Sequence, residues 1–191
     1  MSLPRVVVIG RMNVGKSTLF NRLISERKAI VSEIAGTTRD RLHGIVDWDG
    51  RQFELVDTGG LDVSQAEIIE QNVVIQAERA ITDSDVILFV VDARSGLLPQ
   101  ERELVRHLRK AKQPVILAAN KADAPRLRQE IFEFQKLGLG EAIPVSATTG
   151  AGTGDLLDII CKKLPKRKNI QATSYKLQAI KVAIVGRPNV G

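Results

Sequence analysis

The sequence predicts an α/β domain built on a six-stranded, mostly parallel sheet. Two short runs, 86–91 and 114–119, are apolar at almost every position, which is typical of parallel strands buried on both faces. Segments whose apolar residues recur at helical spacing alternate with such runs. Asp49-Gly50 lies between two further strand-like segments and is a strong hairpin signal, so one edge strand is expected to be antiparallel.

The other elements follow from the same local patterns. Strands are expected at 6–9, 43–48, 52–56, 86–91, 114–119 and 142–145. Helices are expected at 16–25, 64–81, 99–111, 126–137 and 155–164. Gly138 is expected to cap the fourth helix, because glycine adopts the left-handed conformation readily. The polar segment 26–41 has no periodicity and is expected to be a mobile loop.

Composition limits the class of protein. The 191 residues suffice for one α/β domain with an extension, and no apolar run approaches the roughly twenty residues of a membrane span. The first strand begins so early that it leaves no room for a signal peptide. The single cysteine, Cys161, excludes an internal disulfide. We therefore expect a cytoplasmic protein, and we expect it to be a monomer that contacts no membrane.

The basic charge is concentrated at the C-terminal end. Residues 1–161 carry 20 basic and 22 acidic side chains, whereas residues 162–191 carry eight basic side chains and no acidic one. Pro165 lies within a cluster of basic residues that is typical of a linker leaving a helix. The cluster is either a solvated, flexible connector or a segment that attaches to RNA phosphates.

The last ten residues repeat the beginning of the chain. Residues 182–191 match residues 6–15 at six of ten positions, and three other positions exchange one apolar residue for another. We interpret this as a tandem repeat that is cut off before its lysine. The predicted organisation is a first domain at 1–164, a basic linker at 165–180 and the truncated start of a second, similar domain at 181–191.

The sequence Gly-Arg-Met-Asn-Val-Gly-Lys-Ser at 10–17 follows the first strand and opens the first helix, as phosphate-binding loops do. Gly10 and Gly15 let backbone N–H groups approach a polyphosphate at the positive end of the helix. Lys16 adds a positive charge between the outer phosphates. A glycine-rich turn that matches by accident is the alternative. The residues expected to contact the nucleotide here are Asn13, Val14, Gly15, Lys16, Ser17 and Thr18.

The sequence Asn-Lys-Ala-Asp at 120–123 follows an apolar strand and suits recognition of guanine. Asp123 can accept hydrogen bonds from guanine N1–H and the 2-amino group together, and adenine offers neither donor. Asn120 is expected to brace a neighbouring loop and contact N7, and the stem of Lys121 to lie on the ring. Ser146 and Ala147 end the last strand, where the Ala147 N–H can donate to guanine O6. The alternative is an ordinary aspartate that caps a helix.

Three residues are expected to serve Mg²⁺, which prefers hard oxygen ligands and keeps several waters. Ser17 and Thr38 would bind the ion, and Asp57, at the end of a strand, would hold a metal-bound water. Thr38 and Gly60 lie in loops that would contact a γ-phosphate only while it is present. Hydrolysis is therefore expected to release both loops.

The five motifs GRMNVGKS, GTTRD, DTGG, NKAD and SA resemble, in this order, the G motifs of translation-factor-like P-loop GTPases. GTTRD and the tandem repeat resemble the TrmE-Era-EngA-like family, above all its tandem GTPases that assemble ribosomes. The resemblance covers residues 5–161 and the start of the repeat. It implies a three-layer Ras-like fold, GTP or GDP with Mg²⁺, a second GTPase domain, a KH-like domain, and action on the large ribosomal subunit or its rRNA.

Leu61 stands where Ras-like GTPases carry a glutamine that orients the attacking water. Relatives with a hydrophobic residue there often use K⁺, held partly by a phosphate-loop asparagine that Asn13 matches. The resemblance therefore implies K⁺-assisted hydrolysis, in which Lys16, Asn13, Thr38 and Gly60 are catalytic. In the alternative, Asn13 only stabilises the loop.

Two functions remain open. The favoured one is a GTP-hydrolysing switch domain that acts in assembly of the large ribosomal subunit. The alternative is a nucleotide-sensing regulatory module with negligible hydrolysis, which Leu61 keeps open. A P-loop kinase is less favoured, because it would need an acceptor site and a lid and because the Asn-Lys-x-Asp motif argues against it.

Overall fold

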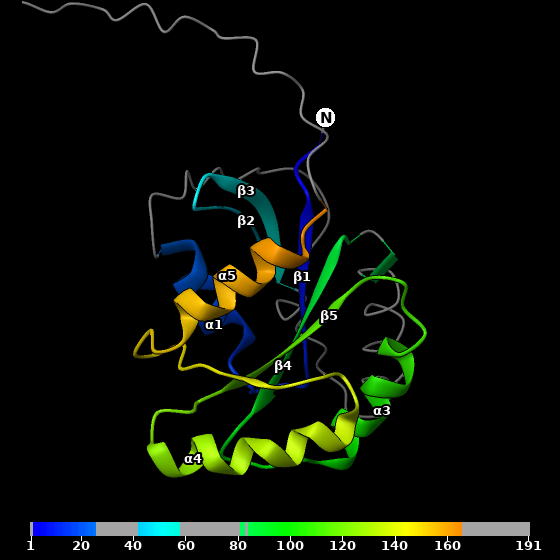
Figure 1. Ribbon diagram of the computed structural model, residues 1–191, viewed down its shortest axis with the longest axis vertical. Helices are drawn as coiled ribbons and strands as arrows, with labels where there is room; N and C mark the ends of the chain where they lie inside the picture. The colour runs from blue at the N-terminus through cyan, green and yellow to red at the C-terminus, as the bar shows by residue number, and fades with distance from the viewer. Residues whose placement is uncertain (1, 26–41, 58–80, 83, 166–191) are drawn as a thin grey trace, which may run out of the picture.

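The computed structural model describes residues 2–25, 42–57, 81–82 and 84–165. Within them, six strands form one sheet in the order β2-β3-β1-β4-β5-β6 (Figure 1). The strands are β1 (Arg5–Ile9), β2 (Leu42–Trp48), β3 (Arg51–Asp57), β4 (Val86–Asp92), β5 (Val115–Asn120) and β6 (Ile143–Pro144). The helices are α1 (Lys16–Ser25), α3 (Pro99–Leu108), α4 (Pro125–Glu130), α5 (Thr153–Lys163) and the 3₁₀ helix η1 (Ile131–Leu137).

Several expectations fall on residues that the structure does not describe. They are the loop at 26–41, most of the helix at 64–81, nearly all of the linker at 165–180, and the repeat at 182–191. Of the helices in the described ranges, none is long and apolar enough to cross a membrane.

The sheet is mostly parallel, with one antiparallel edge strand, as predicted. β2 pairs antiparallel with β3, and the other neighbouring strands pair in parallel. In the β2–β3 hairpin Trp48 lies opposite Arg51, and Asp49 and Gly50 between them have φ values of 50° and 72°. Two consecutive left-handed residues are typical of the type I′ turn, whose twist matches that of the flanking strands.

Helices cover both faces of the sheet (Figure 1). Along β1, Val6 and Val8 belong to the core beneath α1 and α5, whereas Val7 and Ile9 belong to the core beneath α3 and η1. β4 is buried at every position, as expected for a central strand between two layers of helices. The three-layer α/β architecture is therefore confirmed.

The helix expected at 126–137 is wrong in its second half. The α-helical turns of α4 end at Glu130, and the 3₁₀ helix η1 continues to Leu137. Ile131, Phe134 and Leu137 are all buried, and residues three apart lie on one side of a 3₁₀ helix. Gly138 follows in the left-handed conformation with φ 64°, so the predicted cap is confirmed.

The parallel strands end at one edge of the sheet, where their loops meet. Val8 lies opposite Asp57 on the neighbouring strand, and Asp92 lies opposite Asn120. In open α/β sheets ligands bind at the carboxyl ends of the strands. The fold thus gathers the loops that begin at Gly10, Ala93 and Lys121.

Candidate nucleotide-binding site

The loop between β1 and α1 is fitted closely to its neighbours. A Cβ on Gly10 would lie 2.3 Å from the carbonyl oxygen of Val90, and one on Gly15 would lie 2.4 Å from Asn120 Nδ2. Gly15 also has a φ of 89°, which favours glycine. Both glycines are therefore required by packing within the protein.

Side chains from the end of β5 hold this loop in place. Asn120 Nδ2 donates to the carbonyl of Val14 at 2.9 Å, and Asn120 Oδ1 accepts the Ala147 N–H at 2.9 Å. Lys121 Nζ donates to the carbonyl of Asn13 at 2.7 Å. The phosphate loop and the loop after β6 are thus joined by one buried amide side chain.

Lys121, whose stem is expected to lie on the guanine ring, also connects the phosphate loop to β4. Besides its bond to the phosphate loop, its Nζ lies 2.7 Å from Asp92 Oδ2 at the end of β4. Burial raises the pKa of Asp92, but hydrogen bonds from Lys121 and the Arg94 backbone N–H outweigh it, and the net shift is downward. Asp92 is therefore held as a carboxylate, and it fixes the lysine that supports the loop.

Lys16 lies at the start of α1, and its Nζ donates to the carbonyl of Arg11 at 2.8 Å. Burial lowers the pKa of Lys16, the charge of Asp57 opposes that shift, and the Arg11 guanidinium adds to it; the net shift is downward. A half-buried cation beside backbone N–H groups at a helix N-terminus suits a polyphosphate. The glycine-lined loop and this lysine fit the triphosphate that the sequence predicts.

Mg²⁺ fits the same end of the sheet through a few oxygens. Ser17 is exposed in the first turn of α1, and Asp57 is fully buried where β3 ends. In the part of the chain that the structure describes, no group of three or more His, Cys, Asp or Glu residues could hold a metal. Thr38, Gly60 and Leu61 lie outside the described residues.

Asp123 is bound by two side chains. One carboxylate oxygen accepts the Ser146 hydroxyl, and the other forms an ion pair with Arg94 Nη2. The Ser146 hydrogen bond lowers the pKa of Asp123, slight burial opposes it, and Arg94 lowers it further, so the net shift is downward. Asp123 is therefore a carboxylate at neutral pH, as guanine recognition requires.

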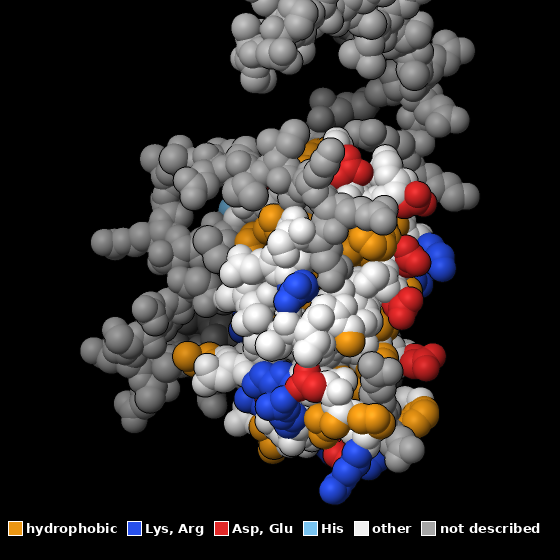
Figure 2. All heavy atoms as spheres, turned by 90° about the vertical axis from the view of Figure 1, so that its left-hand side faces the viewer, with side chains coloured by type: hydrophobic (Ala, Val, Ile, Leu, Met, Phe, Trp, Pro, Cys, Tyr) orange, Lys and Arg blue, Asp and Glu red, His pale blue; other side chains and the backbone are white. Residues whose placement is uncertain are grey.

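The loop after β6 is fastened to α1. Arg22 Nε donates to the carbonyl of Ala147 at 3.0 Å, and Arg22 Nη2 donates to the carbonyl of Thr148 at 2.6 Å. These bonds fix the position of the Ala147 backbone, whose N–H donates to Asn120 Oδ1. Figure 2 shows a cluster of Lys and Arg side chains in the lower part of the face that includes α1 and α5, and further ones elsewhere on that face.

Sequence reasoning missed four positions of this site. Asp92 could have been found, because it follows an apolar strand as Asp57 does. Arg22 and Arg94 carry no local signal, since their contacts lie across the fold. The fourth is Glu101, a fully buried residue of α3 whose Oε1 lies 2.8 Å from Arg11 Nε.

Curated proteins resemble this chain along its whole length. GTPase Der of Caldanaerobacter subterraneus subsp. tengcongensis is 50% identical over all of this chain, and GTPase Der of Streptococcus gordonii is 46% identical. The chain spans 43% of the length of these two relatives.

Solved structures are also similar to this chain in fold and in sequence. Era of Aquifex aeolicus, bound to GDP and AlF4⁻, is 32% identical with a TM-score of 0.68, covering 87% of this chain and 58% of that one. The G domain of the T. maritima FeoB iron transporter is 27% identical with a TM-score of 0.58, covering 84% of this chain and 98% of that one.

Three features define a P-loop GTPase domain: the three-layer fold, the phosphate loop held by Asn120 and Lys121, and the Asn-Lys-x-Asp segment. The family model of 50S ribosome-binding GTPases matches residues 5–121, and the chain belongs to that family. Guanine nucleotide and Mg²⁺ are the ligands of this class of protein.

Proposed function

We propose that the chain hydrolyses GTP to GDP and phosphate as a cytoplasmic switch in assembly of the large ribosomal subunit. The observation that supports GTP binding is that two groups of residues lie at the same edge of the sheet. One is the half-buried Lys16 in a loop held by Asn120 and Lys121, and the other is the Asp123 carboxylate, which accepts the Ser146 hydroxyl.

The roles of the residues follow from their chemistry. Asp123 accepts N1–H and the 2-amino group of guanine, and Asn120 braces the phosphate loop and contacts N7. The Ala147 N–H, which donates to Asn120 Oδ1 in this structure, is the proposed donor to guanine O6. The charge of Lys16 and the N–H groups of Asn13 to Thr18 hold the phosphates. Ser17 and Thr38 would bind Mg²⁺, and Asp57 would hold one of its waters. Bound Mg²⁺ offsets charge on the phosphate oxygens.

Hydrolysis assisted by K⁺ is the finer part of the proposal. Asn13 is exposed in the left-handed conformation with φ 62°, and its carbonyl is fixed by Lys121. Its backbone is therefore set before any ion binds. An ion held there would add positive charge beside the phosphates, as Lys16 does. The nucleotide-sensing module with negligible hydrolysis stays the alternative.

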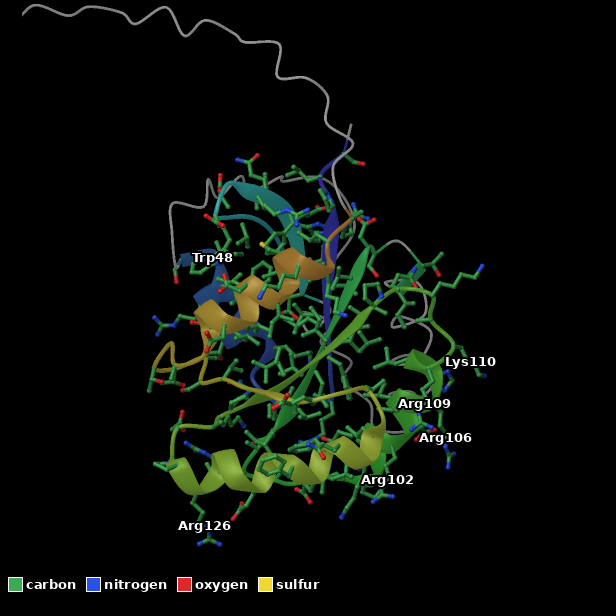
Figure 3. The ribbon with its side chains drawn as sticks, viewed as in Figure 1. Trp48, Arg102, Arg106, Arg109, Lys110 and Arg126 are labelled. Carbon is green, nitrogen blue, oxygen red and sulfur yellow. The ribbon has the colours of Figure 1, made fainter. Side chains whose placement is uncertain are left out.

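Three observations support ribosomal RNA as the partner. The family is described as ribosome-binding, and a solved structure of Era contains MgGDPNP and nucleotides 1506–1542 of 16S ribosomal RNA. Exposed basic side chains also project from α3 and from the two residues that follow it, at the lower right of Figure 3. They are Arg102, Arg106, Arg109 and Lys110, here called the α3 basic face. The relatives' greater length leaves room for the second GTPase domain and KH-like domain that we propose.

Calorimetry with purified protein tests the nucleotide assignment. GDP and GTP should bind, and ADP and ATP should bind at least about a thousandfold more weakly, because adenine leaves the Asp123 carboxylate without its two donors. The variant Asp123→Asn should lose this preference while it keeps the fold. Equal binding of adenine and guanine nucleotides by the wild type would contradict the proposal.

A further inference from the structure

Arg94 forms an ion pair with Asp123, the carboxylate that binds guanine in the proposed function. It lies two residues beyond the end of β4, and its backbone N–H donates to Asp92 Oδ1 at 2.9 Å. Its side chain is 60% exposed and pairs with Asp123 through Nη2. The backbone of Arg94 is therefore anchored, while its guanidinium extends through solvent to a single carboxylate.

The two donors on Asp123 approach from different directions. Ser146 is fully buried, so its hydroxyl reaches the carboxylate from within the protein. Arg94 is mostly exposed, so its guanidinium reaches the carboxylate from the solvent side. A base that binds from solution must reach Asp123 from that same side.

The chemistry of the two solvent-side donors is alike. A guanidinium presents neighbouring N–H groups in one plane, and guanine presents N1–H and its 2-amino group in one plane. Both can donate to a carboxylate from one plane, and in this structure Arg94 Nη2 donates to Asp123 Oδ2 while Oδ1 accepts the Ser146 hydroxyl. We infer that Arg94 acts as an internal substitute for guanine, pairing with Asp123 in the nucleotide-free domain and yielding it when the base binds.

This inference rests on the proposed function and adds a consequence for rates. Only domains in which Arg94 has left Asp123 can accept the base, so the apparent affinity falls in proportion to their fraction. An ion pair this exposed shifts that fraction roughly two- to fivefold. Because the competition acts on the free domain, its effect falls on the association rate and leaves the dissociation rate unchanged.

The test is stopped-flow binding of a fluorescent GDP analogue to the wild type and Arg94→Ala. We expect association to become roughly two- to fivefold faster in the variant, with an unchanged dissociation rate and a correspondingly lower Kd. Arg94→Lys, which keeps a cation without the planar fork, should lie between them. Arg126→Ala is the matched control. It removes another exposed arginine from an ion pair, 2.9 Å from Glu130, at the lower left of Figure 3.

The other outcomes are distinct. If Arg94 merely attracted anionic nucleotides, Arg94→Ala would slow association, and if it braced Asp123 around the base, dissociation would become faster. Either result, or rates equal to the wild type, overturns the inference and leaves guanine recognition standing. Failure of the wild type to bind the GDP analogue would overturn the proposed function and this inference with it.

Discussion

Two consecutive residues, Asn120 and Lys121, decide the shape of the phosphate loop. Asn120 holds the carbonyl of Val14, and Lys121 holds the carbonyl of Asn13 and pairs with Asp92. Asn13 and Lys121 both adopt positive φ values, 62° and 66°, which non-glycine residues seldom do. The two unusual backbones are joined by the Lys121 side chain, so each supports the other.

Lys121→Met should destabilise the fold and weaken GDP binding. It leaves the nearly buried Asp92 carboxylate without its cation, at a cost of about 1–2 kcal/mol because Lys121 is itself partly exposed. Urea denaturation at neutral pH measures this loss, and Lys112→Met, an exposed lysine, is the control.

The same pair gives a pH dependence. The pKa of Asp92 is lowered in the folded state, so its contribution to stability is present above its unfolded pKa and is lost as the pH falls through its folded pKa. The difference between the wild type and Lys121→Met should therefore shrink in acid. A constant difference from neutral pH to strongly acidic pH would contradict this account of the pair.

The K⁺ hypothesis is also a statement about one residue. Single-turnover GTP hydrolysis by the wild type should be faster in K⁺ than in Na⁺, and Asn13→Ala should remove most of that difference. Equal rates in the two salts for the wild type, unchanged by Asn13→Ala, would exclude K⁺ assistance and favour the nucleotide-sensing module.

At the scale of elements, helix α3 is tied to the phosphate loop through one buried residue. Glu101 Oε1 accepts from Arg11 Nε at 2.8 Å, and Glu101 Oε2 accepts the Leu98 N–H at 2.8 Å. One carboxylate thus accepts a backbone N–H at the N-terminus of α3 and a guanidinium N–H from the loop. The position of α3 on its face of the sheet and the position of Arg11 are set together.

Glu101→Gln should cost about 1–3 kcal/mol of folding stability, because a half-buried guanidinium loses its countercharge. A double-mutant cycle with Arg11→Met measures the coupling, which should reach about 1 kcal/mol or more. Glu103→Gln, an exposed neighbour on the same helix, should leave stability almost unchanged. Additive effects of the two substitutions would mean that the contact contributes nothing of its own.

At the scale of the molecule, charge is distributed unevenly. The α3 basic face lies to the right in Figure 3, away from Arg126 at the lower left. Arg109 is partly engaged, since its Nη2 donates to the carbonyl of Leu137 at 2.8 Å. Arg102 and Arg106 stand one helical turn apart, and they are the residues best suited to neighbouring phosphates.

Replacing Arg102 and Arg106 together by alanine should weaken binding to large-subunit rRNA about tenfold at low salt. The slope of log affinity against log salt should fall by up to about 2, because two phosphate contacts are lost. Filter binding over a salt series measures both quantities. Arg126→Ala combined with Lys136→Ala removes the same charge from another surface and should change neither.

Much of this molecule could be predicted from local pattern. The strands follow from unbroken apolar runs, and the hairpin follows from Asp49-Gly50. The second half of the helix expected at 126–137 could not be predicted, because apolar residues three apart also fit a period of 3.6 over so short a stretch. The contact between Arg94 and Asp123 could not be predicted, because the two residues are 29 positions apart in the sequence. Local pattern does not show which side chains of two such loops meet in space.

The phosphate loop is encoded near the start of the chain, yet the groups that hold it come from positions 106 and 108 residues later. A nascent chain that has completed β1 and α1 carries the motif without its supports. Competence to bind a nucleotide therefore arises late in synthesis, once β5 has joined the sheet, and half-made domains compete little for the cell's GTP.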